Sequence, residues 1–257
     1  KPPLTRRGGG TRWPARPNRG DIRGHKRDGS RDEAEPRHGE LLASDFEAPG
    51  PAVKRLGAKG CQEEIEGSTQ LDTSGIKLFR SGAARANYLA MDRAGLGYPA
   101  KELCKRMAAP TQHDWCSLQR IVKYLKNEPR LVYHYQWQRN DDAIKVFVDT
   151  DFVGCLLTRK STSGGCALRG THLIKHWSST QKVVTLSSGD AELTGIVKGA
   201  AEALGIRSLS ADLGLDCSLK IYAASSAAIG ISKRSGTGRV RHIARGQLWV
   251  QQRWKTK

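Results

Sequence analysis

Two aspartates close a short apolar run in the middle of the chain, where residues 145–154 read KVFVDTDFVG. Asp149 and Asp151 stand two residues apart, at the end of a run short enough for one buried strand. Aspartate is a poor strand former and is costly to bury without a partner. This strand end is therefore the first place to look for carboxylate chemistry.

Glu192 is a possible partner, because it falls in the first turn of a long helix that the sequence predicts further on. If that helix packs across a sheet containing the strand, Glu192 and Asp149 can meet. Two carboxylates at close range repel each other unless a cation lies between them, and Mg²⁺ prefers such oxygen ligands. Isolated acidic residues at strand and helix ends are usually caps or surface groups, so the spacing alone leaves both interpretations open.

The elements that must position these acids are predicted from periodicity and from capping signals. In the third predicted helix, Thr111 and Asp114 form a capping-box pattern ahead of an apolar face. We expect helices over 82–95, 100–109, 111–127, 187–204, 227–232 and 245–254, and strands over 144–148, 164–168, 173–177 and 219–222. From residue 144 onward this order predicts an α/β fold with a mixed sheet and flanking helices.

Composition predicts three regions and a polyanionic partner. Hydrophobic residues make up only 38% of the chain, and the formal net charge is +18. Residues 1–70 are rich in Arg, Gly, Pro and acidic residues, which predicts a disordered basic segment. Residues 71–138 are expected to form a helical segment and residues 139–257 the mixed domain. The charge favours nucleic acid as the partner, although a basic tail beside a neutral domain would give the same excess.

Six cysteines occur without any C-x-x-C pair, so free thiols in a reducing compartment are expected rather than a zinc ribbon or a disulfide framework. The sequence has no apolar run long enough to span a bilayer, and its first residues lack the apolar core of a secretory signal. We therefore expect an intracellular protein, cytoplasmic or nuclear. The chain does not begin with Met, which is consistent with a fragment.

The stretch from Asp149 to about Leu204 resembles the RNase H region of copia-type retrotransposon polyproteins. That family combines a D-A-D-W-A-G strand end with T-R-(K/R)-S-T-S-G, W-x-S-x-K-Q and S-S-x-E-A-E-Y segments. The residues that match are Asp149, Asp151, Gly154, Thr158, Arg159, Lys160, Ser161, Thr162, Ser163, Gly164, Trp177, Ser178, Ser179, Gln181, Lys182, Ser187, Ser188, Ala191 and Glu192. Residues 79–126 resemble the segment that links the polymerase to RNase H in the same polyproteins, through Arg80, Ser81, Tyr88, Leu89, Arg93 and Trp115 among others. A polymerase Y-x-D-D motif is absent.

The resemblance implies an RNase H-like fold that cuts the RNA strand of an RNA–DNA hybrid, with two Mg²⁺ ions held by four carboxylates. It assigns the first two carboxylates to Asp149 and Glu192. The third and fourth positions fall on Ala224 and Ala244, so we expect weak or absent Mg²⁺ binding and lost or much reduced nuclease activity. Two alternatives remain: an active ribonuclease H, with rescue by Asp151, Asp190 or Asp216, and a basic module that only binds nucleic acid.

Basic residues are the predicted contacts to the nucleic-acid backbone. The resemblance places such contacts near the loop SKRSGTGRVRHIAR, and an ordinary solvated loop explains the same charges equally well. The candidates are Arg159, Lys160, Lys233, Arg234, Arg239, Arg241 and His242.

Overall fold

The computed structural model describes residues 29–56, 67–139, 142–155, 157–236 and 245–253. Its buried side chains form two separate clusters, one among residues 42–125 and one among residues 144–250. The boundary predicted near residue 138 falls between these clusters. Independent folding of the two parts stays a prediction.

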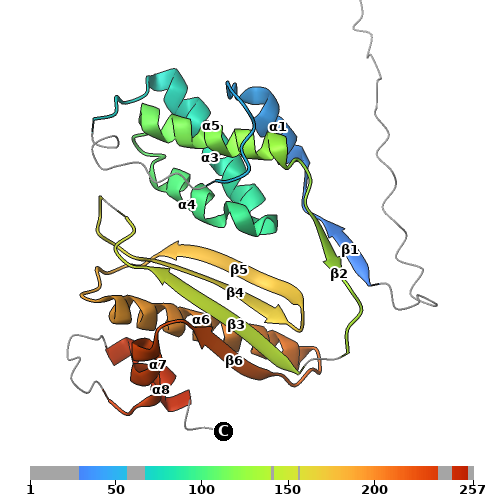
Figure 1. Cartoon of the computed structure of the whole chain (residues 1–257), viewed down its shortest axis with the longest axis vertical. Helices are drawn as coiled ribbons and strands as arrows, with labels where there is room; N and C mark the ends of the chain where they lie inside the picture. The colour runs from blue at the N-terminus through green and yellow to red at the C-terminus, as the bar shows by residue number, and fades with distance from the viewer. Residues whose placement is uncertain (1–28, 57–66, 140–141, 156, 237–244, 254–257) are drawn as a thin grey trace, which may run out of the picture.

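The first cluster lies within a group of helices (Figure 1). Their bounds are α1 (Arg37–Asp45), α3 (Thr73–Asp92), the 3₁₀ turn η1 (Ala94–Leu96), α4 (Gly97–Lys105) and α5 (Gln112–Asn127). The predicted capping box of α5 is confirmed, because Asp114 accepts a hydrogen bond from the Thr111 backbone N–H at 2.8 Å. Helix α3 is longer than predicted and begins at an Asp72 cap, whose side chain accepts from the Gly75 N–H.

Part of the segment predicted to be disordered is folded. β1 (Ser30–Glu33) pairs antiparallel with β2 (Val132–Tyr135), and α1 follows directly. Leu42 of α1 and Phe46, which follows it, are fully buried against α3 and α5, so this segment contributes to the helical core. The prediction of a disordered segment over residues 1–70 is therefore wrong for this part. Residues 1–28 and 57–66 lie outside the described residues.

The second cluster lies between a four-stranded sheet and the helices that follow it (Figure 1). The strand order is β5-β4-β3-β6; β4 is antiparallel to β3 and β5, and β6 is parallel to β3. The predicted α/β fold with a mixed sheet is confirmed. The elements are β3 (Ala143–Asp151), β4 (Thr162–Arg169), β5 (His172–Thr180), α6 (Ser188–Asp212), β6 (Ser218–Ala223), α7 (Ser226–Lys233), the 3₁₀ turn η2 (Arg245–Gln247) and α8 (Trp249–Arg253).

Two glycines let α6 approach β3 closely. A Cβ atom at Gly195 would lie 2.6 Å from Thr150 Oγ1, and one at Gly199 would lie 2.4 Å from Val148 Cγ1. Residues 144, 146, 148 and 150 of β3 therefore face α6, and residues 145, 147, 149 and 151 point to the opposite face of the sheet.

Gly199→Ala should destabilise the protein by about 1–3 kcal/mol, because the new methyl group has to displace a buried, branched Val148. Gly205 lies on the same helix, and a Cβ atom added there would meet no other atom within 4 Å, so Gly205→Ala is the matched control. That control should gain about 0.5–1 kcal/mol from helix propensity. Urea unfolding measures both, and equal effects would contradict the close packing of α6 on β3.

Five cysteines lie within the described residues, and all five are free thiols, as expected. Within the same part of the chain, every helix falls short of the length or apolarity that crossing a membrane requires.

Candidate carboxylate site

Asp149 and Ala224 directly follow the last residues that pair between the parallel strands β3 and β6. The pairing of β3 with β6 runs up to Val148 opposite Ala223, and the next residues are Asp149 and Ala224. On its other side, Asp149 pairs with Gly164 of β4. Because parallel strands end at the same edge of a sheet, side chains at these two positions share one local environment.

Glu192 reaches the same end of the sheet from α6. Ser187 caps this helix by accepting a hydrogen bond from the Asp190 N–H at 3.2 Å. Glu192 lies one turn before Gly195, on the side of the helix that faces the sheet, because residues three apart share a helix face. The helix therefore places Glu192 next to Thr150, whose hydroxyl donates to the Ala191 carbonyl at 3.5 Å, and Thr150 is the neighbour of Asp149 in β3.

The electrostatics show that the two carboxylates interact. Burial raises the pKa of Glu192 above its usual 4.5, and the nearby charge of Asp149 raises it further. One carboxylate oxygen of Glu192, Oε2, is buried and has no hydrogen-bond partner. A buried anionic oxygen without a donor is costly, and a bound cation would relieve both this cost and the repulsion from Asp149. These two groups thus fit a divalent ion.

The third predicted ligand position cannot contribute, because Ala224 carries only a methyl group. Among the described residues, no three His, Cys, Asp or Glu side chains are grouped so that they could hold a metal ion. Ala244, at the fourth predicted position, lies outside the described residues. The donor set that the structure provides is therefore two carboxylates.

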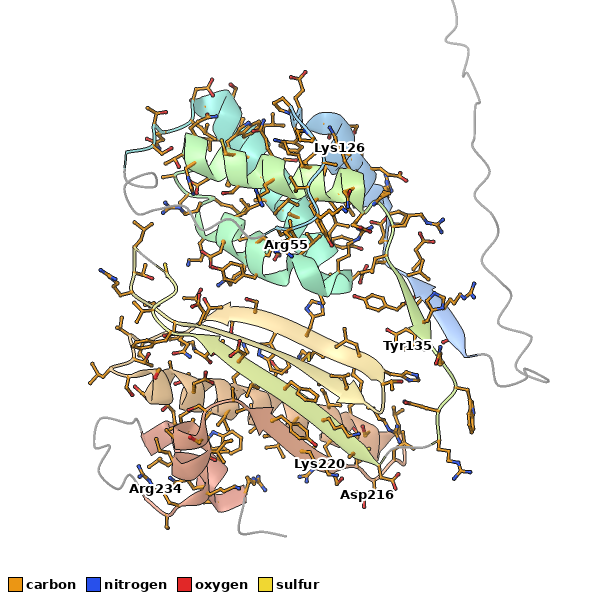
Figure 2. All side chains as sticks on the ribbon, in the orientation of Figure 1. Arg55, Lys126, Tyr135, Asp216, Lys220 and Arg234 are labelled. Carbon is orange, nitrogen blue, oxygen red and sulfur yellow. The ribbon has the colours of Figure 1, made fainter. Side chains whose placement is uncertain are left out.

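The three aspartates considered as substitutes take other places. Asp216 precedes β6 and so lies at the opposite end of this strand from Ala224 (Figure 2). The pKa of the Tyr98 phenol in α4 is raised first by burial, then by the charge of Glu102, and then by the charge of Asp151, which lies close enough to contribute. Asp190 is buried in the first turn of α6. None of the three therefore occupies the strand-end position that Ala224 takes beside Asp149.

A buried polar network holds the two carboxylate-bearing elements together. The Gln181 side-chain Nε2 donates to Ser163 Oγ at 2.9 Å and to the Ala191 carbonyl at 2.8 Å. Ser161 is buried as well, and its hydroxyl accepts from the Val153 N–H at 3.1 Å. Gln181 thus links β4, which pairs with β3 at Asp149, to the start of α6 beside Glu192. Sequence reasoning named Gln181 and Ser161 only as matching positions and gave them no structural role.

The predicted basic contacts are spread over several elements. Arg159 and Lys160 belong to the loop between β3 and β4, where Arg159 has a left-handed backbone with φ of 54°. Lys233 ends α7, and Arg234 follows it (Figure 2). Arg239, Arg241 and His242 lie outside the described residues. The described four thus come from two separate segments of the chain.

Glu192→Gln should stabilise the protein at neutral pH and leave its stability unchanged below about pH 4. The folded pKa of Glu192 is raised, so the folded state binds more protons than the unfolded state between the two pKa values. The free energy of unfolding therefore falls as the pH rises from the usual pKa of 4.5 through the folded one, and glutamine abolishes this fall. Urea unfolding at about pH 4 and pH 7.5 measures the difference.

Glu202 of the same helix provides a control of opposite sign. It forms an ion pair with Lys175 at 2.6 Å, so Glu202→Gln should leave the stability unchanged or lower it at neutral pH, by up to about 1 kcal/mol. An equal gain from Glu192→Gln at both pH values would show that the carboxylate charge is not the cause.

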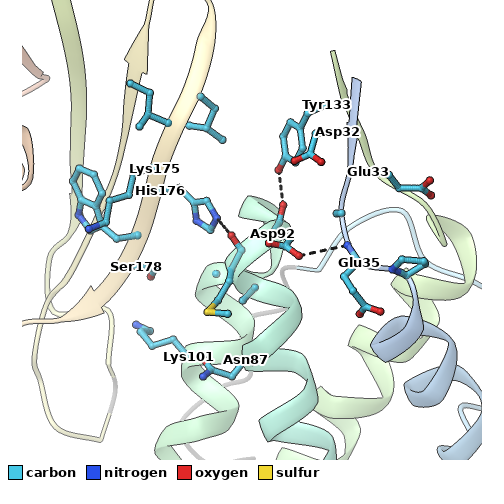
Figure 3. A pocket seen from close by; sticks show the side chains of 18 of the residues that line it. Asp32, Glu33, Glu35, Asn87, Asp92, Lys101, Tyr133, Lys175, His176 and Ser178 are labelled. Atoms are coloured by element: carbon cyan, nitrogen blue, oxygen red, sulfur yellow. Dashed lines mark hydrogen bonds between the residues drawn. The ribbon is translucent and has the colours of Figure 1, made fainter. Parts of the chain in front are cut away.

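A cavity of about 1070 Å³ lies away from the carboxylates, between the β1–β2 pair, the end of α3 and β5 (Figure 3). Around it Tyr133 donates to the Asp92 carbonyl at 2.9 Å, and the Glu35 N–H donates to the Asp92 side chain at 3.4 Å. Glu33 is bound by Arg130, and Lys175 by Glu202, so these wall charges already have partners. The cavity does not include Asp149 or Glu192.

The chain is similar to proteins encoded by plant transposons. It is 31% identical over 150 residues to the retrovirus-related Pol polyprotein from transposon RE2 of Arabidopsis thaliana, covering 56% of this chain and 10% of that protein. It is 26% identical over 202 residues to the retrovirus-related Pol polyprotein from transposon TNT 1-94 of Nicotiana tabacum, covering 77% of this chain and 15% of that protein.

A shorter relative is an uncharacterized mitochondrial protein of Arabidopsis thaliana, 32% identical over 126 residues, which are 48% of this chain and 51% of that protein. The chain thus spans about half the length of this relative and a small part of the two polyproteins. No protein-family model and no solved structure matches the chain.

Proposed function

The chain is related to the Pol polyproteins of copia-type retrotransposons, and we propose that residues 139–257 are an RNase H-like domain that binds RNA–DNA hybrid and has lost most of its Mg²⁺-dependent nuclease activity. The observation that supports this proposal is the action of the Asp149 charge on the partly buried Glu192, at the end of the sheet where β6 runs into Ala224.

Asp149 and the unpartnered Oε2 of Glu192 are the groups that would hold a divalent ion. When bound, Mg²⁺ polarises a phosphodiester and lowers the pKa of a coordinated water. The residues present would hold one ion at the end of the sheet where the charge of Asp149 acts on Glu192, and they supply two negative charges to it. Mg²⁺ gives up its water shell reluctantly and is retained by charge, so a site with two carboxylates in place of four holds it weakly.

The general affinity for nucleic acid is supported by charge. The chain carries 43 Lys and Arg residues against 25 Asp and Glu residues. Backbone phosphates are neutralised by such side chains without sequence preference, and the released counterions make the binding strongly salt-dependent. Arg159 and Lys160, in the loop that follows β3, are the described basic side chains nearest in sequence to Asp149 on its C-terminal side.

Two measurements on the full chain test this proposal. A labelled RNA–DNA hybrid should bind at about 50 mM salt and lose at least about tenfold in affinity at 200 mM. The same hybrid should stay uncut with Mg²⁺ or Mn²⁺. An absence of binding at the lower salt concentration would remove nucleic acid as the ligand.

If the unaltered chain cleaves the hybrid and Asp149→Ala abolishes this cleavage, the proposal that nuclease activity is lost is wrong. Asp216→Ala is the matched control, since it removes an exposed aspartate at the other end of β6. A contaminating nuclease would leave cleavage unchanged in both variants, and the proposal would then stand.

A further inference from the structure

The sheet face opposite α6 carries two exposed aromatic rings. Phe147 of β3 and Tyr222 of β6 are neighbours across the parallel pair and keep exposed fractions of 42% and 44%. The helical segment covers the β5 side of the sheet, where His176 bonds to the Met91 carbonyl and lies beside Gly97. The β3–β6 side therefore keeps two large apolar rings in solvent, an arrangement that costs free energy unless a ligand covers it.

The two rings are stacked on each other. Their centroids are 4.8 Å apart and their planes differ by 12°. β6 is the last strand of the four-stranded sheet, so among the described strands none lies beyond Tyr222. One ring face of Tyr222 is thus turned toward the open edge of the sheet, and a further flat ring can extend the stack there.

Lysines lie beside the aromatic pair. Lys145 and Lys220 are register partners two residues before Phe147 and Tyr222, on the same face of the two strands. Lys220 is exposed at the edge (Figure 2). Both side chains are positively charged, so they draw anions to this face of the two strands.

We infer that this face binds single-stranded nucleic acid, with a nucleobase stacked on the outer ring face of Tyr222 and an adjoining phosphate near Lys220. Aromatic rings bordered by cationic side chains fit this ligand in particular, because every base has a flat π face and every link between nucleotides carries a negative charge. A neutral peptide or an uncharged lipid would cover the apolar rings without using the lysine pair.

The surface leads to the carboxylate site. Asp149 lies two residues beyond Phe147 on the same side of β3, about 7 Å along the strand. A strand bound by Tyr222 would therefore run toward Asp149. The inference rests on the proposed nucleic-acid binding in its general form, but it needs neither a metal ion nor cleavage.

The test is the affinity of the full chain for a short fluorescent oligothymidylate, measured by anisotropy in EDTA. Tyr222→Leu keeps an apolar side chain but removes the ring, and it should weaken binding by about 5- to 150-fold. Tyr222→Phe keeps the ring and should bind like the unaltered chain. Tyr88→Leu removes a similarly exposed tyrosine from α3 (exposed fraction 45%) and should have no effect.

Equal affinity of Tyr222→Leu and the unaltered chain would overturn the inference, and so would an equal loss in Tyr88→Leu. A dimer that Tyr222→Leu dissociates, with unchanged oligonucleotide affinity, would assign the face to a second copy of this chain instead. If Tyr222→Leu fails to fold, photo-crosslinking of a 4-thiothymidine oligonucleotide to the unaltered chain decides. Crosslinks in the peptide of residues 218–225 support the inference, and crosslinks confined to other peptides refute it.

The two proposals fail separately. Hybrid binding by the unaltered chain, together with oligothymidylate affinity that is insensitive to Tyr222→Leu, would reject the stacking surface and leave the RNase H-like assignment intact. No binding of either hybrid or single strand would reject both.

Discussion

Replacing Ala224 and Ala244 together by aspartate should raise the rate of hybrid cleavage in Mg²⁺ by at least about 10³-fold. Removing one preorganised electrostatic group from an active site typically costs about 10²–10³ in rate, and the double variant restores two such groups. Ala224 directly follows Ala223, which pairs with Val148, so the new carboxylate would lie at the same end of the parallel pair as Asp149. The measurement is single-turnover cleavage of a labelled hybrid.

The control for this experiment separates charge from size. Ala224→Asn with Ala244→Asn adds nearly the same volume without the negative charge, and it should leave the chain inactive. Adding Asp149→Ala to the aspartate variant should abolish the gain. If the aspartate variant folds, binds hybrid and still does not cut, the strand end of Asp149 is not a nuclease site.

Arg93→Ala should lower the free energy of unfolding by about 3 kcal/mol. Arg93 is only 3% exposed, and its guanidinium donates to the carbonyls of Glu128, at 2.8 Å, and Pro129. Hydrogen bonds from a charged group contribute about 1.5–3 kcal/mol each, and the variant would leave two carbonyls without their donor. This side chain ties the end of α3 to the chain just after α5. Urea unfolding measures the loss.

Arg80 is the matched control because it lies on α3, the helix that Arg93 follows, and also donates to two backbone carbonyls, those of Met107 and Ala108. Arg80 is exposed, so water replaces its hydrogen bonds and Arg80→Ala should cost less than about 1 kcal/mol. A similar cost for both variants would contradict the role given to burial at Arg93.

The elements with clear local signals were predictable. The capping box at Thr111 and the serine cap at Ser187 place the starts of α5 and α6 from a few neighbouring residues. β1 carried no such signal, since its four residues are polar and all exposed, and it forms only because β2 pairs with it across about 100 residues of sequence. Composition alone suggested disorder in this segment. It missed Leu42 of α1 and Phe46 just after that helix, two apolar side chains that complete the helical core.

The candidate site was predictable in part. Asp149 stands out by its position on an apolar strand, and the resemblance identified Glu192, Ala224 and Ala244. The aromatic pair needed the register of β3 with β6, which brings together residues 75 positions apart in the chain. Alternation along β3 does place Phe147 and Asp149 on one face, so half of that surface was visible in the sequence.

Two lysines of helix α4 contact the first residue of β4 and the loop that precedes it. Lys101 donates to Thr162 Oγ1 at 2.9 Å, and Lys105 contacts the Cys155 thiol at 3.2 Å. A fragment trimmed to residues 139–257 would therefore lose two anchors of the segment that follows Asp149. A piece of this protein suited to crystallisation or enzymology should consequently begin before α3. Trimming at residue 138 would loosen the end of the sheet that carries Asp149.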